Sequence, residues 1–473
     1  MDRTWMDGLR WILRSLLLLM FVGGCSDKKA GNFAESKPSD PAASGEVSSE
    51  DAGEPMTDLT EPPIDDTGEM PATAGGEPSD VTAEMPPILI PRDEAPATNA
   101  PAEGDPEGGS PDHVPGHTIR RSGVSTDHRG YSPERVFFAT NREPERSPDS
   151  AADPDLFFSG DRGDLSYGIV EVSIPYKRQP GTLPEPSVLR LEFSQDPAKH
   201  VVLMEIERLP DAQFWRALRF KVEQSSEKQL FVFIHGYCAT FRDAARRTAQ
   251  MAYDINYQGT SMFFSWPAGS DTESFEEKAN YLKDLRRAEQ SDDDLITVLE
   301  GISRYSGAAR IHLVAHSMGN FVLTEALKTM DDRRGSAVVQ PALFDQVALA
   351  APDIDAREFV ERVGLRLKPF SRRFTVYASN EDKALYVSKK VNDFEPLGYL
   401  NQYSQRGAKK QMFDLVDASQ LSTGWFDSGH IYYGDMPEMI TDVSFVFRGI
   451  QASSLQRGLA ETPPMFRLTR RGP

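Results

Sequence analysis

One short stretch restricts the possible folds of this chain more than any other. Residues 311–314 (IHLV) have the composition of a buried strand, and residues 320–330 carry apolar side chains at helical spacing. Between them lie residues 315–319 (AHSMG), with Ser317 at their centre. Small residues stand two positions before and two after this serine, as is needed where a strand and a helix approach closely. The stretch therefore predicts a strand, a tight turn with Ser317 at its apex, and a helix.

The same alternation of patterns extends over most of the second half of the chain. Helical patterns occupy residues 239–254, 279–305 and 319–330. Strand-like runs, several of them almost entirely apolar, lie at 136–140, 168–174, 201–206, 230–234, 262–265, 311–315, 346–350, 374–378 and 412–416. Alternating strands and helices predict an α/β fold, and nearly continuous apolar strands are typical of a mainly parallel sheet covered by helices on both faces.

The turn at Ser317 is close to a known catalytic motif. In the nucleophile elbow G-x-S-x-G of α/β-hydrolases, the serine sits on a strained turn between a strand and a helix, and its hydroxyl projects above the sheet. Ala315 replaces the first glycine here, which adds one methyl group to the turn. The structural alternative is a serine that only caps the helix. The placement between strand and helix favours Ser317 as a nucleophile.

A second loop supplies what such a nucleophile needs. The strand at 231–234 runs into residues 235–238 (HGYC). In the hydrolase fold this loop and the residue after the nucleophile each give one backbone N–H to an oxyanion hole. We therefore expect the N–H groups of Tyr237 and Met318 to be the donors. His235 precedes the nucleophile in the chain and is expected to be a structural residue of the loop.

The base and the acid should follow the nucleophile, because the fold carries them in the order serine, acid, histidine. His430 is the only histidine after Ser317 and is therefore the expected base, although a histidine in such a Gly- and Ser-rich segment is ordinarily a surface residue. Two carboxylates compete as the acid. Asp382 follows the strand at 374–378 and is favoured; Asp353, after the strand at 346–350, is the alternative.

With these residues in place, residues 135 to 440 resemble a group of bacterial α/β-hydrolases that are esterase- or lipase-like and otherwise uncharacterised. The resemblance implies the triad Ser317, Asp382 and His430. Cys238 departs from it, since relatives are expected to carry Asn or Asp there. The matching pieces are residues 136–142, 165–168, 172–175, 233–237, 264–267, 315–319, 351–355 and 379–385.

The N-terminus has the pattern of an export signal. Three arginines precede a short apolar run at 16–22, which is followed by two glycines and Cys25. This resembles a bacterial lipoprotein signal over residues 1–25, with Cys25 as the lipidation site. Two acyl chains on Cys25 would anchor the exported chain to the cell envelope, and Ser26 favours the outer membrane by resemblance to known sorting. The alternative is an ordinary cleaved signal.

Charge divides the rest of the chain. Residues 26–118 hold 21 Asp and Glu against 4 Lys and Arg, out of a formal net charge of −20 for the whole chain. This Pro-, Glu- and Ala-rich stretch is expected to be a disordered tether, because it cannot bury enough apolar surface to fold. The hydrolase domain is expected at 119–450 and a C-terminal tail at 451–473. The sequence contains no stripe of basic residues, so nucleic acid is not expected as a partner.

Together these features predict a serine hydrolase that cleaves carboxylic esters through an acyl-enzyme. The expected substrate is a small-molecule or lipid ester, and no cofactor or metal is expected. The sequence leaves the protein partners unknown. Thioesterase, amidase or acyltransferase action could use the same triad. A different class of function stays open as well: a hydrolase-fold module without catalysis, tethered at the envelope to bind a partner.

Overall fold

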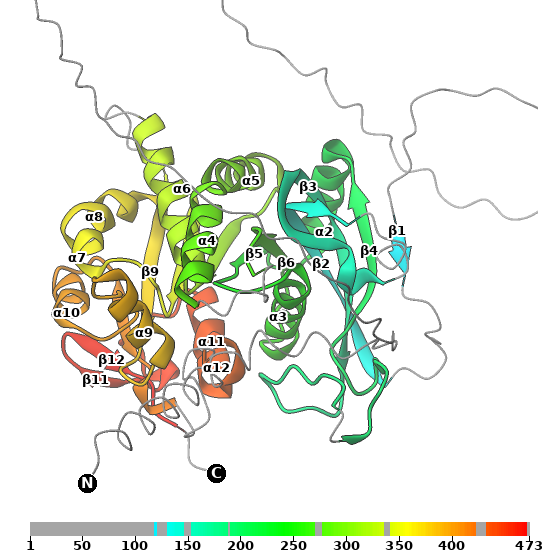
Figure 1. Ribbon diagram of the computed structural model, residues 1–473. Helices are drawn as coiled ribbons and strands as arrows, with labels where there is room; N and C mark the ends of the chain where they lie inside the picture. Colours follow the sequence, from blue (N-terminus) through cyan, green and yellow to red (C-terminus); the bar gives the residue numbers. More distant parts are fainter. Residues whose placement is uncertain are drawn as a thin grey trace, which may run out of the picture. The chain divides into compact units, whose positions relative to one another are not determined.

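The computed structural model describes residues 118–120, 130–145, 153–187, 190–269, 277–334, 341–421 and 432–470. These residues form one α/β domain, in which helices flank a twelve-stranded sheet (Figure 1). The α/β-hydrolase fold predicted from the sequence is confirmed. Within the described residues, no helix is both long enough and apolar enough to cross a membrane.

The sheet has a parallel centre and antiparallel edges. Its strand order is β1-β4-β3-β2-β6-β5-β7-β8-β9-β10-β12-β11. Neighbours from β2 to β12 along this order pair in parallel, whereas β1, β4, β3 and β2 pair antiparallel, as do β12 and β11. The strands are β1 (Thr118–Arg120), β2 (Tyr131–Pro144), β3 (Phe158–Pro175), β4 (Leu203–Leu209), β5 (Gln229–Ile234), β6 (Thr260–Ser265), β7 (Arg310–His316), β8 (Phe344–Ala350), β9 (Ser371–Ala378), β10 (Asp414–Asp417), β11 (Ala460–Thr462) and β12 (Met465–Arg467).

Both faces of the sheet are covered by helices, and the covering explains the strand sequences. All six residues of β5 are buried, but successive side chains point to opposite faces. Val232 and Ile234 join the apolar cluster that packs against α2, α5 and α6, whereas Phe231 and Phe233 join the cluster against α3 and α12. A strand buried on both faces therefore needs a continuous apolar run, as the sequence shows.

The helices begin at recognisable caps. Thr240 and Asp243 form a capping box at the start of α3, directly after the loop that follows β5. Three aspartates occupy the first turn of α5, where the helix dipole favours negative charge. The helices are α2 (Asp211–Gln224), α3 (Phe241–Asp254), α4 (Glu277–Glu289), α5 (Asp292–Tyr305), α6 (Gly319–Arg334), α7 (Ala356–Glu358), α8 (Gly364–Leu367), α9 (Lys383–Asn392), α10 (Gln402–Lys409), α11 (Tyr432–Asp435) and α12 (Pro437–Phe447).

The topology fixes where a site can form. The chain leaves β5 towards β6 on one side and returns to β7 on the other side of β5. Ligands of open α/β sheets bind at such a switch point, outside the carboxyl ends of the strands. The loop after β5 and the turn after β7 therefore meet at one edge of the sheet.

Two elements differ from the sequence-based expectation. The helix expected over 279–305 is two helices, because the chain turns at Ser291 between α4 and α5. The expected C-terminal tail at 451–473 is part of the domain as far as residue 470. Its strand β12 pairs in parallel with β10, and Leu468 is buried in the core.

This C-terminal segment is held by a fully buried ion pair. Arg457 donates two hydrogen bonds to Asp442 on α12, at 2.8 and 2.6 Å, and the Tyr377 hydroxyl donates to the same carboxylate at 2.8 Å. Each of the two charged side chains is at most 1% exposed. The three side chains join β9, α12 and the segment that leads to β11.

We expect Arg457→Met to lower the free energy of unfolding by about 3–5 kcal/mol, because Asp442 would stay buried without its cation. Denaturant unfolding of the purified domain measures this. The combination with Asp442→Leu and Tyr377→Phe should restore most of the loss, since no charge or donor is then orphaned. As a control, Arg219→Met breaks an exposed pair with Glu223 on α2 and should cost no more than about 1 kcal/mol. A loss below that value for Arg457→Met would contradict the assignment.

Candidate active site

Ser317 lies on the turn between β7 and α6 with its backbone in a left-handed conformation. Its φ is +52°, which non-glycine residues adopt at an energetic cost. The Ser317 N–H donates to the carbonyl of Ala350 at 3.0 Å, and the Ser317 carbonyl accepts from the N–H groups of Asn320 and Asp353 at 3.0 and 3.3 Å. The residue is 4% exposed. These bonds hold the strained turn between β7 and β8.

The turn is possible only because its neighbours are small. A Cβ on Gly319 would lie 2.3 Å from the carbonyl oxygen of His235, and a Cβ on Gly236 would lie 2.8 Å from the Cβ of Ser317. The loop after β5 therefore touches the serine directly. Ala315, where the motif has glycine, is buried in the core cluster together with residues of α6, so its methyl group is accommodated.

Two backbone amides predicted as oxyanion donors lie beside this turn. Met318 directly precedes α6, and the amides at the start of a helix have no acceptor within the helix. Tyr237 lies between Gly236 and Cys238 in the loop that contacts Ser317. The φ of Cys238 is +58°. The arrangement puts both amides at the carboxyl edge of neighbouring strands β5 and β7.

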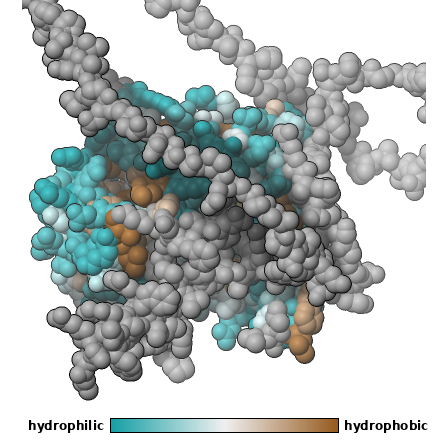
Figure 2. Space-filling model, viewed as in Figure 1, coloured by the Kyte–Doolittle hydropathy of each residue, from teal (hydrophilic) through white to brown (hydrophobic). Residues whose placement is uncertain are grey.

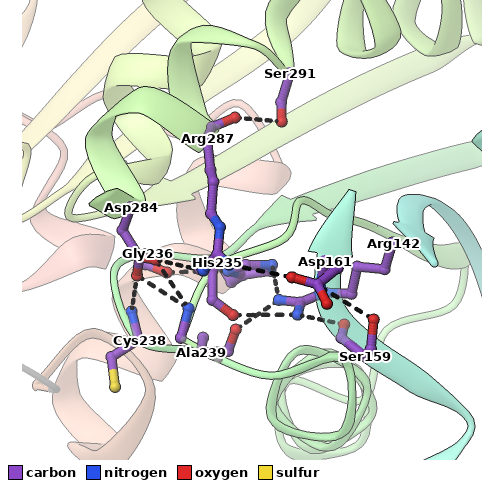
Figure 3. A network of polar contacts seen from close by, with 12 residues as sticks. Arg142, Ser159, Asp161, His235, Gly236, Cys238, Ala239, Asp284, Arg287 and Ser291 are labelled. Atoms are coloured by element: carbon purple, nitrogen blue, oxygen red, sulfur yellow. Dashed lines mark hydrogen bonds and ion pairs between the residues drawn. The ribbon is translucent and has the colours of Figure 1, made fainter. Parts of the chain in front are cut away.

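His235 is a buried structural residue of this loop, as expected from its place in the chain. Its ring stacks on Trp266 at 5.2 Å, its Nδ1 lies 3.0 Å from the Gly236 carbonyl, and its Nε2 lies 3.1 Å from the hydroxyl of Ser265. Burial, with the guanidinium of Arg142 close by, lowers the pKa of His235 to about 3 (Figure 3). The imidazole is therefore neutral near pH 7.

The two carboxylates considered as the triad acid have different surroundings. Asp353 follows β8, and its oxygens accept hydrogen bonds from the Tyr281 hydroxyl at 3.0 Å and the Ser388 hydroxyl at 2.6 Å. Asp382 follows β9 and is 1% exposed. Its Oδ1 accepts from the Leu385 N–H at 2.9 Å and so caps α9. Both stand at the carboxyl edge of the sheet that carries Ser317.

His430 and Cys25 lie outside the described residues, so the structure shows neither the base nor the lipidation site in place. The structure does add residues that sequence patterns did not single out as functional. Tyr281 on α4 and Ser388 on α9 bind Asp353, and Arg142 and Asp284 hold the loop after β5 (Figure 3). Arg142 had a weak signal in the sequence, because two polar residues, at 141 and 142, directly follow the apolar run of β2.

Apolar surface gathers where α4 and α9 lie near one another, among otherwise hydrophilic helices (Figures 1 and 2). Tyr281 on α4 and Ser388 on α9 contact Asp353, whose N–H binds the Ser317 carbonyl in the nucleophile turn.

A separate pocket of about 290 Å³ lies at the amino ends of β9 and β10, beside Arg373 and Asp414. It is at the wrong end of the strands for this fold's active site. Within the described residues, no group of three or more His, Cys, Asp or Glu side chains could hold a metal ion.

Comparison with known proteins finds one family that is similar to the central part of the chain. Residues 211–446 match the family described as alpha/beta hydrolase of unknown function (DUF900). No curated protein matches the chain.

Several solved structures are similar over part of the chain. A predicted CIB-like hydrolase from Thermoplasma acidophilum is 16% identical over 51% of this chain and 90% of its own, with a TM-score of 0.26. An esterase from Rhizomucor miehei is 9% identical over 68% and 84%, with a TM-score of 0.29. A thermostable esterase from Pseudomonas putida is 10% identical over 69% and 73%, with a TM-score of 0.21. These TM-scores are too low to indicate a substrate.

The low pKa of His235 predicts a pH dependence of stability. The unfolded chain takes up a proton at this histidine below about pH 6.5, whereas the folded protein does so only near pH 3. Stability is therefore lost as the pH falls through this range. At pH 4.5 the free energy of unfolding is lower than at pH 7 by about 2–3 kcal/mol because of His235.

The variant His235→Gln, which cannot be protonated, should flatten the fall in the free energy of unfolding between pH 7 and about pH 4.5 by that amount. Denaturant titrations of the wild type and the variant at both pH values measure the difference. Parallel falls in the two proteins would show that His235 is protonated in the folded state.

Proposed function

We propose that this α/β-hydrolase, whose residues 211–446 match the hydrolase family of unknown function, cleaves carboxylic esters with Ser317 as the nucleophile. The observation that carries the proposal is the left-handed turn at Ser317 between β7 and α6, pressed against the loop at Gly236. A serine is held in this strained way where its hydroxyl must project from the sheet edge.

In the proposed reaction, the hydroxyl oxygen of Ser317 attacks the acyl carbon of the ester while His430 accepts the hydroxyl proton. The N–H groups of Tyr237 and Met318 stabilise the negative charge that develops on the carbonyl oxygen. The ester C–O bond then breaks, His430 returns the proton to the leaving alkoxide, and the acyl group stays on Ser317. Water repeats the sequence, with His430 as the base, and releases the acid.

We propose Asp382 as the acid that orients His430 and stabilises its charged form. It follows β9 directly, two strands after the nucleophile strand in the sheet. The alternative is Asp353, whose two oxygens accept hydrogen bonds from the hydroxyls of Tyr281 and Ser388. These bonds suit a carboxylate that holds α4 and α9 beside the site. A small-molecule or lipid ester is the proposed substrate, and the apolar surface beside α4 and α9 supports an apolar acyl group (Figure 2).

A fluorophosphonate probe and a short-chain nitrophenyl ester test the proposal together. The wild type should be labelled and active, Ser317→Ala should lose labelling, and His430→Ala should lose most of both, because the hydroxyl then has no base. Ser371→Ala is the matched control, since this buried serine lies at the amino end of β9 and should leave labelling unchanged. A folded wild type that is neither labelled nor active would favour a binding module.

The acid is tested by two charge-neutral replacements. Asn caps helices as well as Asp, so Asp382→Asn should keep the bond to the Leu385 N–H while the rate falls by about 10³–10⁴-fold. Asp353→Asn should cost far less. A larger rate loss in Asp353→Asn than in Asp382→Asn would move the triad acid to Asp353.

We also propose that Cys25 carries a lipid and anchors the domain at the cell envelope, with the outer membrane as the expected membrane. The support is the sequence pattern of residues 1–25, a short apolar run followed by two glycines and a cysteine. Cys25→Ala should move the protein from the membrane fraction to the soluble fraction on centrifugation. A wild type found in the soluble fraction would contradict the anchor.

A further inference from the structure

Two buried charged side chains hold the loop that carries Tyr237. Arg142, at the end of β2, is 1% exposed and reaches across β6 to this loop. Its Nη2 donates to the carbonyl of Ala239 at 2.6 Å, and its Nη1 donates to the carbonyls of Ala268 and Ser159, both at 3.1 Å (Figure 3). The guanidinium therefore ties the segment after β5 to the segment after β6.

The remaining donors of Arg142 complete a neutral shell. Nε donates to the Ser265 hydroxyl at 2.9 Å, and Nη2 lies 3.5 Å from Nε2 of His235. A guanidinium has five N–H donors, and these five acceptors match them in number. None of the five is a carboxylate, so every hydrogen bond of the guanidinium goes to a neutral acceptor. Burial lowers the pKa of Arg142, and the nearby carboxylates of Asp284 and Asp243 offset this only in part. Such a residue is costly to bury and is well suited to fixing backbone carbonyls.

Asp284 on α4 holds the same two segments by their amides. Its carboxylate accepts from the N–H of Cys238 at 3.1 Å and from the N–H of Gly269 at 3.0 Å. Both residues have positive φ, +58° and +70°, and a Cβ on Gly269 would lie 2.6 Å from the backbone of Cys238. In the loop after β5 the cation binds the Ala239 carbonyl and the anion binds the Cys238 N–H, so both charges hold the residues that directly follow Tyr237.

We propose that Arg142 and Asp284 are positioning residues, which fix the direction of the Tyr237 N–H before substrate arrives. The role assigned to this N–H rests on the proposed ester hydrolysis. An oxyanion donor acts only when it is already aimed at the place where charge develops, and small displacements of such a group are expensive. Cys238 and Ala239, which follow Tyr237, are each bound by a buried charge, and the His235 ring before it contacts Arg142, so the loop around the Tyr237 amide has little freedom to turn.

The test is Arg142→Lys, which keeps the charge but offers only three donors from a single point. We expect kcat for a nitrophenyl ester to fall by about 10²-fold, with KM within about threefold, because the interaction is made in the transition state. Asp284→Asn should act in the same direction, since it removes the negative charge that binds both N–H groups. Hydrogen exchange followed by mass spectrometry should show faster exchange in the peptide 235–241 of both variants.

Arg246→Lys is the matched control. Arg246 is also a buried arginine, on α3, and binds the Val201 carbonyl at 2.7 Å and Glu185, away from the loop. It should lose stability comparably and keep its kcat and the exchange rate of peptide 235–241. If Arg142→Lys behaves like this control in both measurements, the positioning role is wrong. If the wild type has no esterase activity, the proposed function fails and the exchange of peptide 235–241 alone decides the positioning role.

Discussion

The contact between Gly236 and Ser317 is the constraint on which the rest of the site depends. Two chain segments that are 81 positions apart in sequence approach so closely that a methyl group between them would lie 2.8 Å from the serine Cβ. The contact requires that β5 and β7 be neighbours, and the parallel register of these strands supplies this. It also requires a left-handed backbone at Ser317, because an ordinary turn would not bring the start of α6 beneath the loop.

Crowding of this kind strips water from polar backbone groups, which must then find partners within the protein. Here the partners are buried charged side chains, a cation for the carbonyl groups and an anion for the N–H groups. Arg142 takes carbonyl groups and Asp284 takes amide groups of the two loops that face Ser317. His235 completes the shell as a neutral ring, because burial and then the neighbouring guanidinium both disfavour its charged form. The electrostatics of the site therefore follow from how tightly its loops pack.

The parts of the fold with a local signal were predictable. The apolar runs of β5 and β7 and the small residues around Ser317 are patterns that can be recognised within a single segment. The parts that failed depend on distant partners. Strands β11 and β12 have three residues each and were expected to be tail, because β12 is a strand only through its pairing with β10 and β11 only through its pairing with β12. The acceptors of Arg142 could not be predicted for the same reason, since Ala239 is 97 positions away. His430 and Cys25 stay predictions.

The position of Arg142 also bears on the extent of the catalytic unit. The family match begins at residue 211, the first residue of α2, whereas Arg142 belongs to β2, far upstream. Strand β2 pairs in parallel with β6, and the Thr140 hydroxyl donates to the Ser265 carbonyl at 2.6 Å, so the strand is bound to the parallel sheet at the site. A chain cut at the start of the family match would keep Ser317 and lose the guanidinium that holds the loop beside it. The antiparallel strands are thus part of the active-site scaffold, because the loop after β5 contains no side chain of its own that could replace a five-donor cation.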